Sequence, residues 1–473
     1  MFNSAGINLS VEGITPHSVA SRRGFLRTSM SLAGGVGIAG LAGLQQANAG
    51  QVGEKPMGTA VIQIWMGGGP SQYETYDMKP AAPAEIRGPF KPIGTSVPGL
   101  QICELLPQQA KLMDHFSVIR SLTHDTNNHH AASHWMQSGH FGPSAKEQPD
   151  QTRPSIGSVV SATRGPNQTG SFSNVLIAPD PLTEATLLWN FRSAYLGVNH
   201  EPMRVKAARV GKVVAGEHYF NDLIGQPQFE TPAIDLLPGI SVDRLVDRRS
   251  LLQQIDGAVH KLARRTARYS TLRQQAFELI STQRTRNAFD LTRESPKLRQ
   301  RYGDNVWGQG ALLARRLVEA GVTFVTLNLD AYQLAWDTHN YQEREFKKML
   351  PVYDQMLTAL IEDLIDRGRY DQVLVLVVGE FGRTSKINAN AGRDHWGKAG
   401  VALVGGAGIQ GGVVVGATDA RGEYPIDRPV TPGDLLATVY HVLGIDPRHE
   451  FHDEFGRPLP ILSQGRAVHE LLV

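Results

Sequence analysis

Cysteine is almost absent from this chain of 473 residues, which contains a single one, Cys103. One thiol cannot form an intramolecular disulfide, and it cannot build the cysteine cage of a structural zinc site. A metal ion bound by this chain would therefore need His, Asp, Glu, Asn or hydroxyl ligands.

The chain also lacks an excess of charge of either sign, because 47 Lys and Arg residues face 45 Asp and Glu residues. This balance excludes a protein that binds nucleic acid through a bulk basic surface, and it excludes an acidic disordered tail. Apolar residues form 41% of the chain, which is enough to bury a sizeable core. We therefore expect a globular body with no nucleic-acid partner.

No run of 18 apolar residues follows the N-terminal segment, so we expect no stable membrane span in the mature chain. The N-terminal segment itself has the order of an export signal. Arg22 and Arg23 precede an apolar run rich in Gly and Ala over residues 30–44, and residues 47–49 read Ala-Asn-Ala, a pattern for cleavage. Residues 1–49 are thus predicted to be a Tat-type signal peptide, recognised by the Tat translocase, which would make the protein periplasmic or extracellular.

Short apolar runs rich in β-branched residues recur through the rest of the chain and predict buried strands. The runs lie at residues 59–66, 116–119, 174–177, 322–327, 372–378 and 401–404. Runs that are apolar on both faces are typical of parallel strands covered on both sides by helices. Helical patterns lie between them, at residues 251–291, 306–320 and 346–367. This alternation predicts one α/β domain over residues 50–473, with a mainly parallel central sheet.

Polar side chains follow these strands directly, where ligand sites of open α/β sheets lie. Five of the 16 histidines fall within residues 124–140. Taken singly, each could be an ordinary polar loop residue. Imidazoles and carboxylates together are the common ligands of zinc, manganese and iron, and further candidates follow the later strands. These are Asp337, His339, Glu380, Asp394 and His395, so we predict a metal site at this edge of the sheet.

Two further features follow the strands. The run Gly67, Gly68 and Gly69 has neither the spacing of a dinucleotide-binding fingerprint nor the lysine of a P-loop. It indicates either a tight turn or a turn whose amides bind an anion. Arg383 could clamp a phosphate or sulfate through its guanidinium group, or it could form an ion pair with nearby Glu380.

A set of motifs runs through the chain in a fixed order: residues 65–71, Asp77, Pro80, His124, His129, His130, Gly139, and residues 337–339, 379–384, 392–396, 416–419 and 432–440. In this order they resemble the alkaline phosphatase-like superfamily, which includes sulfatases, phosphodiesterases and phosphopentomutases. The likeness is closer to its exported bacterial branch, the DUF1501 family, and covers nearly all of residues 58–447. The resemblance implies an alkaline phosphatase-like fold, a three-layer α/β/α arrangement around a mainly parallel central sheet.

Members of the superfamily hold two metal ions, commonly zinc. This chain matches the ligands of one metal site better than those of the other. Asp337, His339 and His395 can fill one metal site. The second site is depleted, because Gly68 stands at the position of a first-strand carboxylate and Glu380 is followed by Phe rather than His, unless Asp77 or the histidines at 124–130 replace the missing ligands. Glu380, Asp394 and His124 would complete or flank this second site.

The nucleophile position of the superfamily, about ten residues before Gly139, falls on His129, which has no hydroxyl or thiol group. His129 or His130 would then act as nucleophile or general base, unless His129 is a ligand, a metal-bound water attacks or the chemistry has been lost. Arg383, with the amides near Gly68, Gly69 and Ser71, would hold the anion in the transition state.

Two hypotheses follow. The first is an exported hydrolase of phosphate or sulfate esters, acting on a small-molecule or glycan ester. It would depend on a divalent metal, with zinc expected and manganese, iron or calcium as alternatives. The second is an exported binding or scaffolding protein that keeps the fold without turnover.

Overall fold

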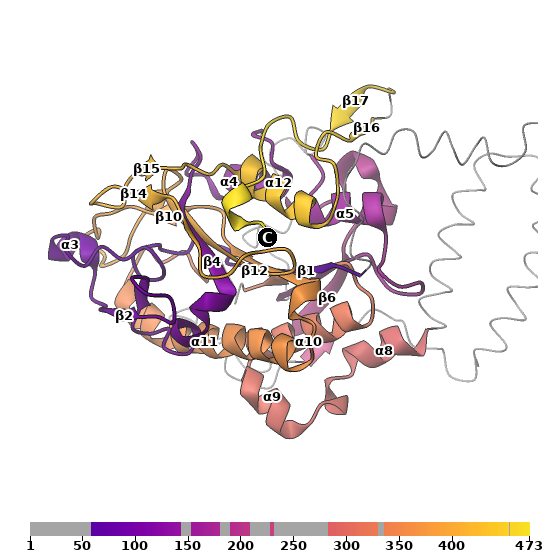
Figure 1. Ribbon diagram of the computed structural model, residues 1–473, viewed down its shortest axis with the longest axis horizontal. Coiled ribbons are helices and arrows are strands. Elements are labelled where there is room, and N and C mark those ends of the chain that lie inside the picture. The colour runs from indigo at the N-terminus through magenta and orange to yellow at the C-terminus, as the bar shows by residue number, and fades with distance from the viewer. Residues whose placement is uncertain are drawn as a thin grey trace, which may run out of the picture. The chain divides into compact units, whose positions relative to one another are not determined.

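The centre of the fold is a nine-stranded sheet in the order β13-β4-β12-β9-β1-β8-β5-β6-β7. Its strands β4, β12, β1 and β6 are labelled in Figure 1. The computed structural model describes residues 58–142, 153–179, 190–208, 228–230, 282–329, 335–453 and 455–473. The strands of the sheet are β1 (Ala60–Trp65), β4 (Phe116–Leu122), β5 (Asn174–Pro179), β6 (Met203–Ala208), β7 (Gln228–Glu230), β8 (Phe324–Asn328), β9 (Val373–Val378), β12 (Gly400–Gly406) and β13 (Val414–Val415). The predicted signal peptide and most of the helix predicted over 251–291 lie outside the described residues.

The sheet is mixed and mostly parallel, in agreement with the prediction from its apolar runs. Strand β1 pairs in parallel with β8 and β9, and β5 pairs in parallel with β6 and β8. Strand β12 is antiparallel to both of its neighbours, β4 and β9. Because β12 reverses direction between them, β4 and β9 run the same way. The carboxyl ends of β1, β4, β8 and β9 therefore lie at one edge of the sheet.

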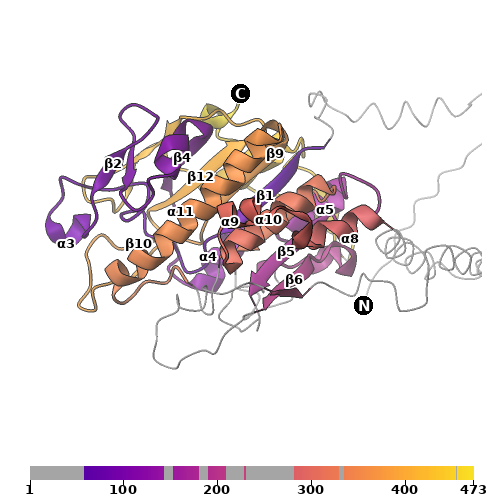
Figure 2. The same cartoon turned by 90° about the horizontal axis from the view of Figure 1, so that it is seen from below.

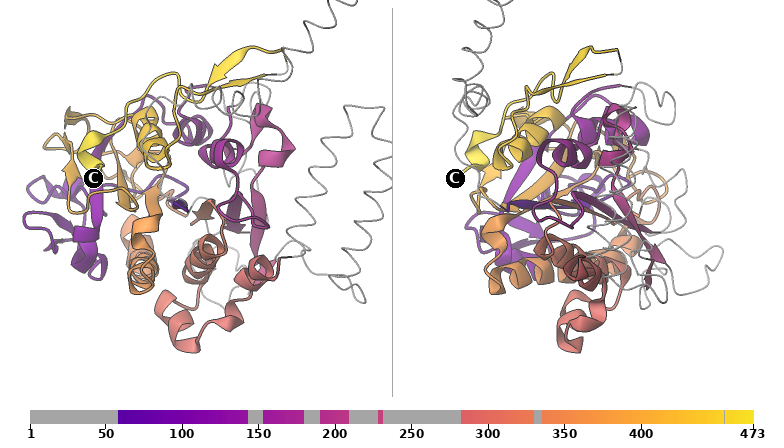
Figure 3. Two further views of the ribbon diagram at one scale, coloured as in Figure 1. Left: turned by 45° about the vertical axis from the view of Figure 1, so that its right-hand side comes forward. Right: turned by 90° about the vertical axis from the view of Figure 1, so that its right-hand side faces the viewer.

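Helices cover both faces of the sheet, which makes the predicted three-layer α/β/α arrangement (Figures 2 and 3). One face carries α9 (Pro296–Tyr302), α10 (Val306–Glu319) and α11 (Gln342–Asp366), and the other carries α4 (His129–Ser138), α5 (Ile156–Arg164) and α12 (Pro432–Val442). Every residue of β1 and β9 is buried, because alternate side chains enter two separate hydrophobic clusters. Ile62 and Ile64 join the cluster under α10 and α11, whereas Val61 and Trp65 join the one under α4, α5 and α12.

The remaining elements are short. They are α3 (Ala84–Arg87), α8 (Gln283–Phe289), the 3-10 helices η1 (Gln109–His115), η5 (Ala194–Leu196), η6 (Val198–His200), η8 (Leu291–Arg293), η9 (Tyr370–Gln372) and η10 (His469–Leu471), and the hairpin pairs β2 (Pro92–Gly94) with β3 (Gln101–Cys103), β10 (Gly382–Arg383) with β11 (His395–Trp396), β14 (Ala417–Thr418) with β15 (Pro425–Asp427), and β16 (Glu450–His452) with β17 (Pro458–Pro460). Among the helices of the described residues, none combines the length and apolar character that a membrane crossing requires.

The long helices stop where the sequence predicts. Gly321 follows α10 with a φ of 99°, and Gly368 follows α11 with a φ of 61°, a backbone region that glycine enters without a steric cost. Both helices turn back into a strand of the sheet, β8 and β9 respectively. These two α-to-β connections bring the segments after β8 and β9 to the same edge.

Candidate metal centre

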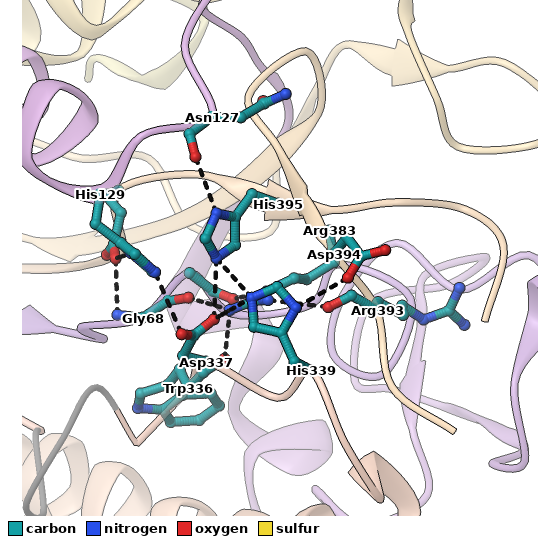
Figure 4. A network of polar contacts seen from close by, with 12 residues as sticks. Gly68, Asn127, His129, Trp336, Asp337, His339, Arg383, Arg393, Asp394 and His395 are labelled. Carbon is teal, nitrogen blue, oxygen red and sulfur yellow. Dashed lines mark hydrogen bonds and ion pairs between the residues drawn. The ribbon is translucent and has the colours of Figure 1, made fainter. Parts of the chain in front are cut away.

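Three histidines from separate segments surround Asp337 at the carboxyl edge of the sheet (Figure 4). His129 opens helix α4, which follows β4. Asp337 and His339 lie between β8 and α11, and His395 lies on β11, the short strand that pairs with β10 after β9. The sequence thus brings together residues that are more than 200 positions apart, as expected from the common direction of these strands.

The position of His129 follows from the way α4 begins. The side chain of Asn128 caps the helix, since its Oδ1 accepts hydrogen bonds from the backbone N–H groups of His130 at 3.0 Å and Ala131 at 3.1 Å. His129 is therefore the first helical residue. Its ring reaches back over the sheet edge, with Nε2 3.3 Å from Asp337 Oδ2.

His339 and His395 approach the other oxygen of the same carboxylate. The Nε2 atom of each ring lies 3.1 Å from Asp337 Oδ1. The two Nε2 atoms lie only 2.8 Å from each other. All three imidazoles therefore direct Nε2 at Asp337, two at Oδ1 and one at Oδ2.

The opposite ring nitrogen, Nδ1, has an oxygen partner in each of the three histidines. His129 Nδ1 lies 2.7 Å from Glu380 Oε1, and His339 Nδ1 lies 2.9 Å from Asp394 Oδ1. His395 Nδ1 lies 2.9 Å from the backbone oxygen of Asn127. Because these oxygens only accept hydrogen bonds, each Nδ1 carries a proton. Each Nε2 then faces Asp337 either as a donor, when the ring is protonated, or with a lone pair that a metal ion could take, when the ring is neutral. Histidines that bind metals are held in this way, with Nδ1–H on a carboxylate or carbonyl.

This donor set fits a divalent metal ion. Two Nε2 lone pairs and a carboxylate oxygen cannot lie about 3 Å from one another unless a proton or a cation lies among them. Ligand atoms of His129, Asp337 and His395 lie within 4.8 Å of each other. A tetrahedral zinc site with bonds of about 2.0–2.1 Å places its ligand atoms roughly 3.3 Å apart, close to the distances seen here.

The electrostatics of the cluster favour a positive charge at its centre. Burial alone would raise the pKa of Asp337, but hydrogen bonds from the three histidines and the charge of Arg383 hold it well below its usual range. Burial opposes charge on His129, yet its contacts with Asp337 and Glu380 outweigh this and raise the pKa of His129 to about 9. The hydrogen bond to Asp337 raises the pKa of His339, whereas burial lowers that of His395. A bound cation would take the place of the protons that the cluster otherwise holds.

Arg383 lies behind Asp337 and is fully buried. Its Nη2 lies 2.6 Å from Asp337 Oδ1, so its ion pair is with Asp337 rather than with Glu380, the alternative raised by the sequence. The other guanidinium contacts are to backbone oxygens of Gly68, Gly69, Trp336 and Arg393. These contacts fix the orientation of the Asp337 carboxylate. The role of Arg383 in binding a substrate anion stays a prediction.

The glycine run after β1 forms a tight turn that itself holds a carboxylate. Gly68 donates its N–H to Glu380 Oε1 at 2.8 Å. Gly69 has a φ of 84°, and a Cβ there would lie 2.4 Å from the ring of Phe381. Ser71 is buried and donates its hydroxyl to Glu74. Substrate anion binding by Gly68, Gly69 and Ser71 stays a prediction.

The other predicted site residues lie around the cluster. Glu380 and Asp394 stand behind His129 and His339 and orient them. His124 is buried, with Nε2 2.6 Å from the backbone oxygen of Glu380, so it contacts the main chain beside the cluster. Burial lowers the pKa of His124, which favours the neutral ring. His130 lies on the first turn of α4, outside the group formed by His129, Asp337 and His395.

Sequence reasoning missed several residues that shape the site. Asn127 accepts from His395 through its backbone oxygen, and its side chain accepts from the N–H of Gly397 at 2.7 Å. Phe381 packs its ring 4.9 Å from that of His129 and 4.6 Å from that of His395. Asn388 donates to Asp394 at 3.1 Å. Only their closeness in sequence to the histidines and carboxylates could have marked them.

Behind the cluster, Arg393 anchors the loop that carries Asp394 and His395. Its Nη2 lies 2.7 Å from Glu74 Oε1, and both side chains are fully buried. The guanidinium group also lies 4.3 Å from the ring centroid of Tyr73 and donates to backbone oxygens of Ile86 and Thr384. This paired and stacked arginine makes the site a rigid part of the fold.

Residues 58–472 match the sequence model of a family described as protein of unknown function (DUF1501). The chain belongs to the DUF1501 family. This confirms the resemblance to the DUF1501 family seen in its motifs, and the matched residues include the candidate metal centre. No curated protein sequence shows a significant match to this DUF1501 chain.

Solved structures similar to this DUF1501 protein include the sulfatase PsFucS1 from Pseudoalteromonas sp., with 10% identity, coverage of 86% of this chain and 70% of that chain, and a TM-score of 0.34. The phosphonate monoester hydrolase from Silicibacter pomeroyi has 10% identity, coverage of 88% and 76%, and a TM-score of 0.36. The C-terminal periplasmic domain of EcEptC from Escherichia coli, in complex with Zn, has 9% identity, coverage of 84% and 86%, and a TM-score of 0.39. Likenesses of this size carry no argument about activity.

Proposed function

We propose that this DUF1501 protein is an exported metal-dependent hydrolase of phosphate or sulfate esters. The observation that carries the proposal is the convergence of three imidazole Nε2 atoms on Asp337, each ring held through Nδ1 by an oxygen acceptor. A scaffold has no reason to keep three imidazoles directed at one carboxylate. Such a set is costly without a cation and favourable with one.

Asp337, His339 and His395 hold the metal in this proposal. Arg383 keeps Asp337 in place, Asp394 keeps His339 in place, and the backbone oxygen of Asn127 keeps His395 in place. Bound there, a divalent ion would supply Lewis acidity toward the ester oxygen and lower the pKa of a coordinated water. Imidazole ligands suit zinc and iron, whereas manganese and calcium prefer oxygen ligands, which only Asp337 supplies in this set. The ring of Phe381 covers His129 and His395 on one side and limits the access of water there.

The class of substrate and the location rest on the sequence. The motif order resembles that of ester hydrolases of phosphate and sulfate, so a small-molecule or glycan ester is the proposed substrate. The paired Arg22 and Arg23, followed by the apolar run, support export as a folded protein. Folding before export is suited to a protein that acquires its metal in the cytoplasm.

A non-catalytic exported binding protein remains the second candidate, and one observation favours it. Arg383 is the cation closest to Asp337, and its contacts hold Asp337 and the backbone rather than an open surface. A substrate anion would then have to bind through the metal and the amides near the cluster alone.

Metal analysis of the purified protein by plasma mass spectrometry separates the two candidates. We expect about one equivalent of zinc, manganese or iron, lost in His395→Ala while the fold is kept, and turnover of phosphate or sulfate esters with that metal. Protein that stays metal-free after reconstitution would refute the hydrolase. Metal without turnover of any ester in the screen would favour the binding protein.

A further inference from the structure

The metal centre proposed above leaves open what His129 does, since the chain has no hydroxyl or thiol at this position. We infer that His129 is a metal ligand, the fourth side chain of a set completed by Asp337, His339 and His395, and not a nucleophile. The inference rests on the proposed metal centre and specifies its ligands and the course of its reaction.

The orientation of His129 is the same as that of the two other histidines. Its Nε2 faces Asp337 at 3.3 Å, and its Nδ1 lies 2.7 Å from a carboxylate oxygen of Glu380. A nucleophilic imidazole needs an Nε2 that is open to the substrate. Here Nε2 is directed at the carboxylate that the other imidazoles share, in the direction of the ion.

The packing fixes His129 next to the other ligands. Its ring centroid lies 4.2 Å from that of His395, with the two planes at 70°. The ring of Phe381 contacts both imidazoles, at 4.9 Å and 4.6 Å. Glu380, fully buried and held by the N–H of Gly68, prevents His129 from turning toward another partner. Side chains locked at both ring nitrogens are typical of ligands that are preorganised for an ion.

A four-ligand set without a protein nucleophile changes the expected reaction. The oxygen of a water molecule forms the bond to phosphorus or sulfur as the bond from that atom to the ester oxygen breaks. One proton of the water passes to the departing alcohol oxygen, so that the products are the free alcohol and inorganic phosphate or sulfate. The chain is never covalently modified, and an odd number of displacements inverts the configuration at a chiral phosphorus.

X-ray absorption spectroscopy of the zinc-loaded wild-type protein tests the ligand set without requiring activity or a variant. We expect three imidazole scatterers in the wild type and in His130→Ala, which changes the neighbouring histidine on α4. In His129→Ala we expect two imidazole scatterers and a zinc affinity that is about 10-fold to 100-fold lower than that of the wild type. His129→Asn, which is close in size, repeats the comparison if the alanine variant does not fold.

The outcomes separate this inference from the proposed function. A wild type that binds no metal refutes both. A wild type that binds zinc and hydrolyses an ester but shows two imidazoles, with unchanged affinity in His129→Ala, overturns this inference alone. Trapping of a phosphate or sulfate group on His129 from a labelled substrate would also overturn it.

Discussion

Glu380→Gln is the most informative single change, because it alters one charge in the shell behind the ligands while keeping the shape of the side chain. Glu380 Oε1 accepts hydrogen bonds from Gly68 N–H at 2.8 Å and from His129 Nδ1 at 2.7 Å. The glutamine oxygen can keep both contacts, but without a negative charge it makes His129 a weaker donor to the metal. We therefore expect the variant to fold and to bind metal less tightly.

The expected loss of metal affinity is about 10-fold to 100-fold, as found for partners that orient metal-binding histidines. At a metal concentration of about 100 times the wild-type Kd, binding stabilises the native state by about 2.7 kcal/mol. A 100-fold weaker Kd at the same concentration leaves only about 0.4 kcal/mol. The rise of the Tm on adding metal should therefore shrink strongly, and competition with a chromophoric chelator should report the change in Kd directly.

The apo protein needs a separate measurement. Glu380 Oε2 is buried and has no hydrogen-bond partner among the described residues. The amide N–H groups of a glutamine would lack an acceptor there, which should cost about 1–3 kcal/mol of stability. Glu343→Gln is the matched control, since Glu343 is exposed and pairs with Lys347 on the surface of α11. Equal metal affinity in Glu380→Gln and Glu343→Gln would refute the reasoning that Glu380 acts through His129.

Three further predictions concern the fold and processing. Gly69→Ala should lower the free energy of unfolding in urea by more than about 2 kcal/mol, because the new Cβ would lie 2.4 Å from the ring of Phe381. Gly99 is the control: it has a similar φ of 82°, a Cβ there would meet no described atom within 4 Å, and Gly99→Ala should therefore cost less. Burial lowers the pKa of His134 to about 4, below its value in the unfolded chain. Between these two pKa values the unfolded chain binds more protons than the folded chain. The free energy of unfolding should therefore fall by about 3 kcal/mol as the pH drops from about 6.5 to 4. His134→Gln should flatten this part of the stability profile, and an unchanged profile would contradict the assignment. Intact mass of the exported protein should show a chain that begins at Gly50, and an uncleaved chain in the periplasm or medium would contradict the predicted signal.

Much of the fold could be predicted, because a strand that is buried on both faces has a continuous apolar run in the sequence. The six apolar runs all became strands of the central sheet, and the alternation with helices gave the layers. Strands β6, β7 and β13 were missed, because β7 and β13 are only three and two residues long and β6 has no continuous apolar run. The reversal of β12 was also missed, since a buried apolar strand reads the same in either direction.

The candidate site was predictable in its residue types but not in their roles. Their place after predicted strands marked Asp337, His339 and His395 as candidates, and the resemblance grouped them as one site. The structure brings these three together. Whether a carboxylate faces the ion or the back of a histidine depends on contacts across the sheet edge. Glu380 and Asp394 take the second position, which no feature of the linear sequence distinguishes from the first.

Contacts across the sheet edge also bear on the two positions at which the resemblance to the superfamily fails. Gly68 stands where the resemblance implies a carboxylate, and its backbone N–H binds the carboxylate of Glu380. Glu380 in turn orients a histidine that stands where a nucleophile would be expected. These contacts are consistent with the proposed centre, in which three imidazoles face Asp337 and no side chain acts as a covalent nucleophile. Restoring only one feature, for example with Gly68→Asp, should therefore not recover a second metal, because the added carboxylate would lie beside that of Glu380 and repel it.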